Sequence, residues 1–455
     1  MLLLLSGCRV APKYQIPVTE CPEVWKNEKE SVRPLKNSDR WWEVFDDENL
    51  NKLEQQALNN NKDLYAAYER VLQARSLAGI AAAETRPQIN CDPNYNNEGI
   101  LYMLYDPIRI EREHRRRNHI PFNLTYEIDL WGKLQKAYES QILNAEAEEE
   151  AFNTLVLILT SDLAASYFQL RTYDTDLNVL QQIINSRKRA YGIAKNRYES
   201  KIISYSDVTR AEFEYKNTES KYFRTLRLRN IQENKIAVLL GIIPSHFKIE
   251  PDSLKQHPPN IPPGLPSEVL LQRPDITEAE RVRASEHASL GVAYASFFPS
   301  LSLTGALGFS SPELKDFLSW KSRFWAMGAN AFQPIYDGGL LKSNLDFAIA
   351  RFKEADAEYQ QQVLKAFQEV EDALADLQGL NDENESLSQA LLAVKTAYKI
   401  SSDRYDRGII SYTDVIDTER QELDSKRILI EILGQKYIAT IQLIKALGGR
   451  WDAGH

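Results

Sequence analysis

Apolar residues recur at every seventh position along a proline-free stretch in the first half of the chain. One seam consists of Leu163, Leu170, Leu177, Ile184, Tyr191 and Tyr198, and a second of Leu159, Ser166, Tyr173 and Leu180. This spacing is typical of the a and d positions of helices that pack side by side. It predicts a helix over 132–197, which at ~1.5 Å per residue would span roughly 100 Å. No globular core needs a helix of that length.

The same pattern returns in the second half of the chain. Three seam positions have counterparts 207 residues later, namely Leu170 and Leu377, Ile184 and Leu391, and Tyr198 and Tyr405. A fixed offset indicates an internal duplication. We therefore expect a first structural repeat over 41–241, a Pro-rich linker over 242–266, and a second repeat over 267–449 that contains a long helix over 338–403.

Each long helix leads into a similar short segment, 198–208 in the first repeat and 405–415 in the second. Both contain a Ser followed three positions later by an Asp, which is the signature of a capping box at a helix N-terminus. Each segment therefore predicts the tip of a helical hairpin. Gly408 suits a left-handed C-terminal cap. Lys201 at the corresponding position predicts that the first tip either turns differently or contacts its partner differently. The second helices of the hairpins are expected over 204–241 and 411–448.

Between the helices the apolar period changes to two. Residues 120–131 place Phe122, Leu124, Tyr126, Ile128 and Leu130 on one side and polar residues on the other, which predicts a strand with one apolar face. The remaining predicted elements are strands over 88–101, 299–311 and 323–336 and helices over 48–86 and 267–298. Between the first two strands, the basic run 112–117 is expected to be a loop, either simply solvated or in contact with anionic lipid headgroups.

The N-terminal segment 1–8 is an apolar run that ends in Leu-Ser-Gly-Cys. This ending resembles a bacterial lipobox, in which Cys8 would be the lipid-attachment site and the acyl chain would supply a membrane anchor. The alternative is an ordinary N-terminus in which Cys8 occurs by chance. Residues 9–40 lack periodicity and predict an extended strap, and residues 450–455 form a C-terminal tail.

Composition and motifs exclude several classes of protein. The formal net charge of −9 argues against nucleic-acid binding, which favours a basic face. No apolar run approaches the ~18 residues that a membrane-spanning helix needs. The motifs of nucleotide-binding loops, metalloproteases and nucleophile elbows are absent, and the six His and three Cys are scattered. We therefore expect no enzyme activity, no metal site and no cofactor.

The four predicted strands, apolar on one face and polar on the other, fit the wall of a membrane barrel. Four strands are too few to close a barrel, since the smallest have about eight. An open strand edge in hydrocarbon would leave backbone groups unpaired. Three copies related by rotation would supply twelve strands and would bring their long helices together into a tube.

Motifs along nearly the whole chain resemble the TolC-like outer-membrane factor family, in particular its lipoproteins that serve as exit ducts of tripartite efflux pumps. The residues that carry the resemblance are Trp42, Phe45, Asp47, Leu50, Asp63-Leu64, Arg70-Val71, Ala74-Arg75, Pro87, the turn Glu127 to Gly132, the junction Phe298 to Leu301, the segment Pro334 to Gly339, and both hairpin tips. Their order and spacing together make the resemblance specific.

The resemblance implies a mostly α, α+β fold, in which duplicated hairpins form a periplasmic α-barrel and the strands form a trimeric 12-stranded outer-membrane β-barrel. It implies a homotrimer that is embedded in outer-membrane lipid. Its implied partners are a periplasmic adaptor protein and an inner-membrane transporter of the resistance–nodulation–division type. The implied adaptor contacts are the turn residues Lys201, Ile202, Ser204, Gly408, Ile409 and Ser411.

The resemblance also implies that acidic residues of the second tip, Asp414 and Asp417, line the periplasmic aperture. Asp207 holds the equivalent place in the first tip, where Arg210 replaces the second acid. Three-fold symmetry would turn each Asp into a ring of three carboxylates whose repulsion favours opening, proton uptake or a bound cation. The alternatives are a capping role alone for Asp207 and Asp414 and a solvated helix charge for Asp417.

These features together favour a passive gated conduit that exports small molecules such as drugs, toxic compounds or metal ions. One alternative is a family member that serves one-step (type I) protein secretion. A more distant alternative is a structural coiled-coil rod without a lumen, which would have no use for paired amphipathic strands.

Overall fold

The structure is a computed structural model that describes residues 13–15, 22, 25–26, 40–105, 108–255, 257–262, 266 and 273–449, without the side chains of 101–105, 108–113, 406 and 412. Cys8, the tail over 450–455, and the start of the helix expected over 267–298 lie outside the described residues. The chain divides into two compact units. The sheet unit comprises described residues of 1–18, 69–149 and 278–360, and the hairpin unit those of 19–68, 150–277 and 361–455.

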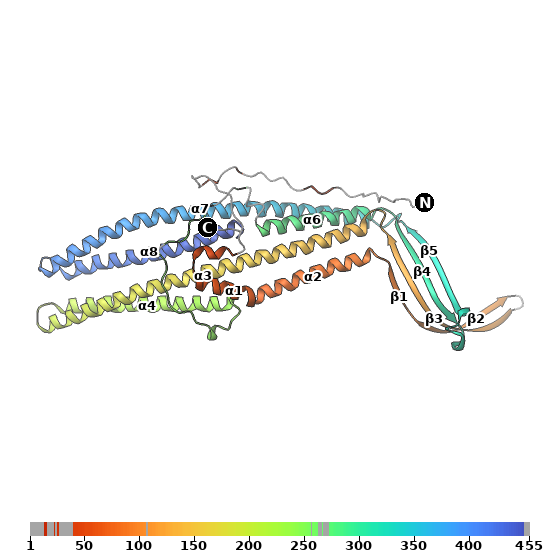
Figure 1. Cartoon of the computed structure of the whole chain (residues 1–455), viewed down its shortest axis with the longest axis horizontal. Helices are drawn as coiled ribbons and strands as arrows, with labels where there is room; N and C mark the ends of the chain where they lie inside the picture. Colours follow the sequence, from red (N-terminus) through yellow and green to blue (C-terminus); the bar gives the residue numbers. More distant parts are fainter. Residues whose placement is uncertain are drawn as a thin grey trace. The chain divides into compact units, whose positions relative to one another are not determined.

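Long helices in two pairs dominate the chain, as the heptad pattern predicts. Helix α3 (Lys133–Glu199) is followed by α4 (Tyr205–Leu239), and α7 (Leu340–Asp406) by α8 (Tyr412–Ala446). Figure 1 shows each pair as a helical hairpin. Shorter helices are α1 (Glu48–Asn60), α2 (Lys62–Glu84) and α6 (Pro274–Ala295).

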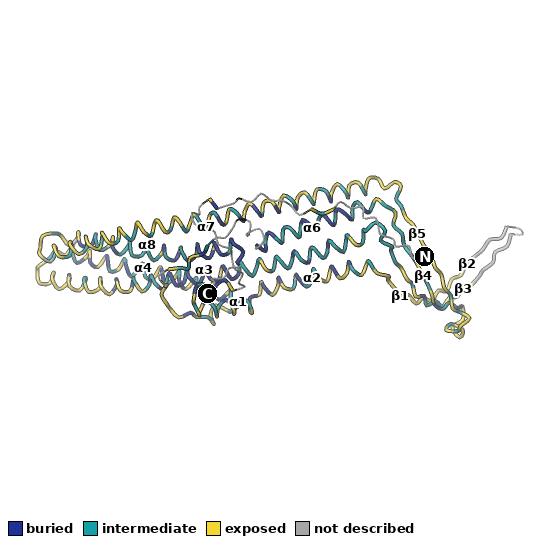
Figure 2. Tube along the Cα trace, turned by 45° about the horizontal axis from the view of Figure 1, so that its top comes forward, coloured by how far each residue is buried: buried dark blue, intermediate teal, exposed yellow. Residues whose placement is uncertain are grey.

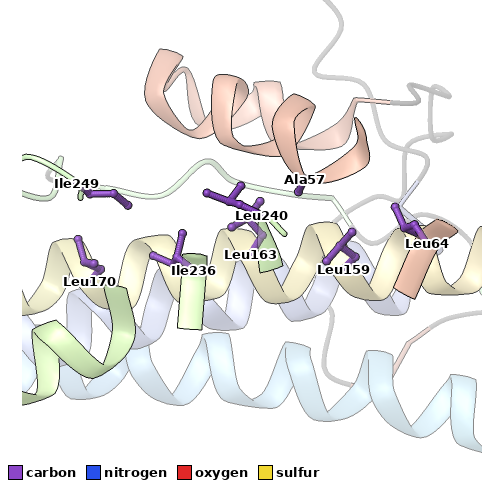
Figure 3. Close-up of a cluster of buried hydrophobic side chains, with 8 residues drawn as sticks. All are labelled: Ala57, Leu64, Leu159, Leu163, Leu170, Ile236, Leu240 and Ile249. Carbon is purple, nitrogen blue, oxygen red and sulfur yellow. The ribbon is translucent and has the colours of Figure 1, made fainter. Parts of the chain in front are cut away.

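The core of the hairpin unit lies where α1 and the start of α2 meet α3 and the end of α4. Its buried side chains, drawn in Figure 3, are Ala57, Leu64, Leu159, Leu163, Leu170, Ile236, Leu240 and Ile249. The seam residues Leu163 and Leu170 have no exposed surface. The heptad pattern therefore identifies the helix face that is buried by packing.

The break between α1 and α2 is built around Asn61. Its side-chain oxygen accepts hydrogen bonds from the backbone N–H groups of Asp63 (2.9 Å) and Leu64 (3.0 Å), which caps α2. Its side-chain nitrogen donates to the carbonyl oxygen of Leu239 at 2.9 Å, which ties the break to the end of α4. Gly241 follows with φ of +69°, and a Cβ there would lie 2.5 Å from the carbonyl oxygen of Asn60.

The sheet unit contains one antiparallel sheet with the order β1-β3-β4-β5, in which β2 also pairs with β3. The strands are β1 (Gln88–Cys91), β2 (Asn94–Tyr105), β3 (Ile108–Ile128), β4 (Ser300–Ser311) and β5 (Arg323–Phe332). At each strand-to-helix junction an Asp carboxylate accepts backbone N–H groups. Asp129 accepts from Gln135 at 2.8 Å, and Asp337 accepts from Leu341 (2.8 Å) and Gly339 (2.9 Å). These bonds from Leu341 and Gly339 hold the pKa of Asp337 below its usual value.

Two sequence predictions about the first strand pair are wrong. The basic run 112–117 is not a loop, because it lies within β3, which pairs with β2 as far as Tyr105 and Ile108. The strand predicted over 88–101 is two strands, since Pro93 has no N–H group to donate to the ladder. The register continues unchanged across this break, from Cys91 opposite Phe122 to Asn94 opposite His119.

The described residues of the N-terminal strap make aromatic contacts. In the sheet unit, the hydroxyl of Tyr14 donates to Glu280 at 2.6 Å and accepts from Arg283 at 3.1 Å. In the hairpin unit, Trp25 is 2% exposed and packs on Phe367, with ring centroids 6.0 Å apart. Tyr14 therefore attaches the strap within the sheet unit, and Trp25 attaches it within the hairpin unit.

Among helices of the described chain, α3 contains an 18-residue window with a mean hydropathy of 1.3, which is long and apolar enough to cross a membrane. The sequence prediction, which considered only uninterrupted apolar runs, did not identify this window. Of the window, 44% is buried. A packed core helix passes the same test, because its buried face is equally apolar.

Candidate functional site

The first candidate site is an exposed apolar face on the sheet. Residues opposite each other on neighbouring strands share a face, so the pairing places Phe122, Leu307 and Trp325 in one row and Leu124, Gly305 and Met327 in the next. Trp325 is 76% and Met327 85% exposed. Figure 2 shows β5 as an exposed strand. Exposed large apolar side chains in adjacent rows are typical of a surface that meets lipid or protein.

The opposite face of the same strands is polar. One row contains Gln88, Thr125, Thr304 and Gly328, and the next contains Asn90, Asn123, Ala306 and Ala326. The end of the sheet that continues into the paired strands β2 and β3 is called its hairpin end. Near that end of the polar face, the ring of His119 stacks on that of Phe324 with centroids 4.7 Å apart. The alternation read from the sequence therefore separates an apolar face from a polar one, as in a membrane barrel wall.

Both edges of the sheet are open within the described part of the chain. Strand β5 pairs only with β4, and β1 and β2 pair only with β3. Open edges leave rows of backbone N–H and C=O groups for another chain to pair with.

The second candidate site consists of the two hairpin tips, 198–208 and 405–415. The turn of each tip is a Schellman motif. In the first, Lys201 N–H donates to the Tyr198 carbonyl (2.8 Å) and Ile202 N–H to the Arg197 carbonyl (2.9 Å). In the second, Gly408 and Ile409 make the same bonds, at 2.8 and 2.9 Å, to residues 405 and 404.

The prediction of a different turn at Lys201 is therefore wrong. Lys201 has φ of +61° and Gly408 has φ of +73°, so both residues are left-handed. The backbone bonds of the Schellman motif hold Lys201 in a conformation that L-residues with a Cβ normally avoid.

Both capping boxes are present. The carboxylate of Asp207 accepts from the N–H (3.2 Å) and hydroxyl (2.9 Å) of Ser204. That of Asp414 accepts from the N–H (3.2 Å) and hydroxyl (3.0 Å) of Ser411. Both Asp side chains therefore cap the start of a helix.

The structure places Asp417 differently from the two capping acids. Its carboxylate lies 3.0 Å from the guanidinium of Arg420, one turn further along α8, and both side chains are about half exposed. Arg210, at the equivalent position of the first tip, donates a hydrogen bond to the hydroxyl of Thr413 in the second tip. Asp417 pairs within its own helix, whereas Arg210 connects the two hairpins.

A second arginine also connects the tips. The guanidinium of Arg197 donates to the hydroxyl of Tyr405 at 3.3 Å and lies 6.0 Å from the centre of its ring. Sequence reasoning missed the pairs Arg197–Tyr405 and Arg210–Thr413, because a contact between repeats has no signature in either repeat alone. The replacement of an acid by Arg210 was the available signal.

Between the tips lies a cavity of about 220 Å³ whose lining includes Ile203, Tyr398, Val415 and Glu419. Burial raises the pKa of Glu419, and it outweighs the lowering by Arg187, whose Nε lies 3.9 Å from the carboxylate. A carboxyl group between the hairpins thus favours its neutral form more than a solvated one does.

Further from the tip, a buried ion pair joins α3 to α4. The guanidinium of Arg187 donates to the Glu214 carboxylate at 2.6 Å and to the Thr218 hydroxyl at 2.7 Å. The side chains of Arg187 and Glu214 are 8% and 10% exposed. Within the described residues, no group of three or more His, Cys, Asp or Glu is placed to hold a metal ion.

Comparison with known proteins gives consistent matches over the whole length of the chain. A family model described as "Outer membrane efflux protein" matches residues 53–242 and 265–449. The chain is 29% identical over 457 residues to the probable outer membrane lipoprotein SilC of Salmonella typhimurium, covering 99% of this chain and 97% of that protein. It is 29% identical over 456 residues to the cation efflux system protein CusC of Escherichia coli O6:H1, again covering 99% and 97%.

Among solved structures, the outer-membrane channel OprN matches with a TM-score of 0.91 and 27% identity, covering 98% of this chain and 100% of that one. The fold class predicted from the sequence is thereby confirmed. Since the family model covers both halves of the duplicated chain, the protein belongs to the outer membrane efflux protein family, the TolC-like channels of the bacterial outer membrane.

Proposed function

We propose that this chain is the exit duct of a tripartite efflux system, a passive gated conduit from an inner-membrane pump to the exterior. The observation that carries the proposal is the exposed apolar face of a sheet whose two edges are open. In hydrocarbon, the apolar face would be solvated by lipid, and the open edges would require partner strands. The polar face would then line a water-filled lumen.

The partner strands are supplied by two further copies of the chain. Strands β1 and β2 pair with β3 in one continuous register, so together they count as a single strand of the barrel wall. Each chain therefore contributes four strands. In a homotrimer, β5 of one copy would pair with the β1–β2 edge of the next, giving twelve strands in a closed barrel.

The gate is formed by the hairpin tips. In the resting state, the bonds Arg210–Thr413 and Arg197–Tyr405 hold the two hairpins of a chain together. Around the three-fold axis, Asp414 and Asp417 would form acidic rings, and Asp207 would contribute an equivalent charge from the first tip. Mutual repulsion of these like charges favours separation of the tips. The two cross-tip bonds oppose this separation, so the pore opens only when they break.

An adaptor protein would lower the cost of that step by binding the turns. The exposed turn residues Lys201, Ile202, Gly408 and Ile409 present an apolar and basic surface for a periplasmic adaptor. The adaptor would connect the duct to an inner-membrane transporter of the resistance–nodulation–division type. A lipid on Cys8 would anchor the strap to the outer membrane, in line with similarity to a protein named as a lipoprotein.

The cargo we propose is a small molecule, namely a drug, a toxic compound or a metal ion. Similarity to a cation efflux protein supports this class. A passive duct needs no metal site of its own, because selection of cargo takes place in the pump.

Conductance in planar lipid bilayers tests the proposal. We expect the purified chain to form mostly closed pores, and Asp414→Asn with Asp417→Asn to change their conductance and reduce their preference for cations. Ser411→Ala is the matched control, since it removes the capping hydroxyl of the same tip and keeps the Asp414 carboxylate. Absence of any pore, with or without these substitutions, would contradict the proposal. Equal effects of Ser411→Ala and Asp414→Asn would reduce Asp414 to a helix cap.

A further inference from the structure

The basic side chains at the hairpin end of the sheet are divided between its two faces. Along β3 the direction of the side chain alternates, so Arg116 and His114 share the face of Phe122, and Arg115 and Arg117 lie on the polar face. All four are exposed. The run of arginines, unexplained by the channel itself, therefore places a cationic group beside the exposed apolar face.

On that face the chemical type of the side chains changes from one row to the next along the strands. The row Phe122, Leu307 and Trp325 is followed by the row Ile120, Phe309 and Arg323, and Arg116 lies two rows further out. The guanidinium of Arg323 lies 3.9 Å from the ring centre of Trp320, which is 76% exposed. An apolar band followed by aromatic and then basic side chains is typical of the boundary between hydrocarbon and headgroups.

The charges on the two faces are balanced differently. On the polar face, Glu98 lies opposite Arg115 in the ladder. On the apolar face, Asn97 lies opposite Arg116 and Gly99 opposite His114. Among the described strand residues of that face near the hairpin end, no side chain is acidic, and the nearby Glu313 pairs with Lys315 at 2.7 Å. Arg116 and Arg323 thus present positive charge without an acidic partner on the same face.

We propose that Arg116 and Arg323 bind the phosphate groups of a phosphorylated lipid in the outer leaflet, with Trp320 and Trp325 against its acyl chains and sugar or glycerol. A guanidinium matches a phosphate with two parallel N–H donors, and a lipid phosphate is held at the depth where the apolar face ends. The inference rests on the proposed function, since that function places the apolar face in the membrane and the hairpin end at the exterior. The partner is a lipid rather than a free anion, because the cations are continuous with the apolar band.

Binding of diphosphoryl lipid A to the full-length protein in neutral detergent tests this inference. We expect Arg116→Gln with Arg323→Gln to weaken binding on the order of 25-fold, about fivefold for each arginine. Arg117→Gln is the matched control, because it removes an exposed arginine from the same strand but from the opposite face. It should bind as the wild type does. The same lipid with its phosphates removed should bind the wild type and the double variant equally weakly.

Three outcomes would overturn the inference. The first is wild-type affinity in the double variant, and the second is an equal loss of affinity in Arg117→Gln. The third is displacement of the bound lipid by millimolar inorganic phosphate, which would indicate a free-anion site. Circular dichroism confirms that each variant is folded. Pore formation in a neutral bilayer is a separate readout, in which the double variant should match the wild type. A wild type that forms no pore contradicts the exit-duct function, whereas loss of lipid discrimination contradicts only this inference.

Discussion

The two hairpin tips have the same backbone built from different residues. Both turn through a Schellman motif and restart through a capping box, yet the left-handed position is Lys201 in one and Gly408 in the other. Three positions after the capping acids, at residues 210 and 417, an arginine that reaches the other hairpin replaces an acid that pairs on its own helix. Duplication has thus preserved the shape of the tip while its charges have diverged. Arg210 bonds the first tip to the second, and the second tip carries the additional acid, Asp417.

The hairpins also differ in what holds their helices together. The first contains the buried pair of Arg187 and Glu214. The residue 207 positions after Arg187 is Val394, and the residue 207 positions after Glu214 is Gln421, so the second hairpin has no equivalent ion pair. A buried ion pair fixes one register of two helices, because any slip leaves a charge unpaired.

The largest expected effect is the loss of that pair. Arg187→Ala leaves the Glu214 carboxylate buried without its partner, which should destabilise the first hairpin by about 3–5 kcal/mol. Val394→Ala, at the equivalent and half-buried position, should cost only about 1 kcal/mol. The midpoint of thermal loss of helical circular dichroism measures both. Replacement of both partners, by Arg187→Met with Glu214→Leu, should restore most of the loss, and a double variant as unstable as Arg187→Ala would contradict this account.

The next effect concerns the connection between the tips. Arg210→Ala removes the hydrogen bond to Thr413, a charged bond worth about 1.5 kcal/mol, so the ratio of open to closed pores should rise about tenfold. Single-channel recording measures this ratio. Thr413→Val, which removes only the acceptor, should act in the same direction. An unchanged open fraction in both variants would show that the hairpins are held by other contacts.

A smaller effect is expected at the turns. Lys201→Gly should stabilise the first tip by about 1 kcal/mol, because glycine adopts a positive φ without a steric penalty. Gly408→Lys should destabilise the second tip by a similar amount. Hydrogen exchange of the amides in each turn provides a local measurement. If Lys201→Gly instead slows export in cells that contain the adaptor, the lysine side chain serves in recognition.

The smallest effect is a change in pH dependence at the cavity between the tips. Burial raises the pKa of Glu419 in the folded protein. Its contribution to stability is therefore complete below the ordinary carboxyl pKa and is lost as the pH rises through the raised value. Glu419→Gln should flatten the decrease of thermal stability over that range. An identical slope in the wild type and the variant would exclude Glu419 as its source.

Much of the fold follows from the sequence because its signals are periodic. Leu163 and Leu170 identify the buried helix face, the constant offset reveals the duplication, and Phe122 and Leu124 mark one face of a strand. The turns followed from their Ser and Asp residues, since a capping box is a local structure with a local signature.

The rest depended on pairing between distant segments. The run 112–117 was predicted to be a loop because it lies between two predicted strands, but pairing with β2 extends the β-hairpin through it. Lys201 was predicted to change the turn, but the hydrogen bonds of residues 201 and 202 outweigh its steric preference. The contacts Arg210–Thr413 and Arg197–Tyr405 connect the two repeats, and neither repeat alone indicates which residue of the other it meets.

The strap contacts have a consequence for how the protein is assembled. Trp25 occupies an almost fully enclosed place on the hairpin unit, and Lys26 donates its backbone N–H to Glu371 at 2.7 Å. A chain shortened before residue 40 would leave that place empty, and a synthetic peptide of residues 13–26 would be its natural ligand. Fragment complementation of this kind would convert a permanent covalent attachment into one whose strength can be titrated.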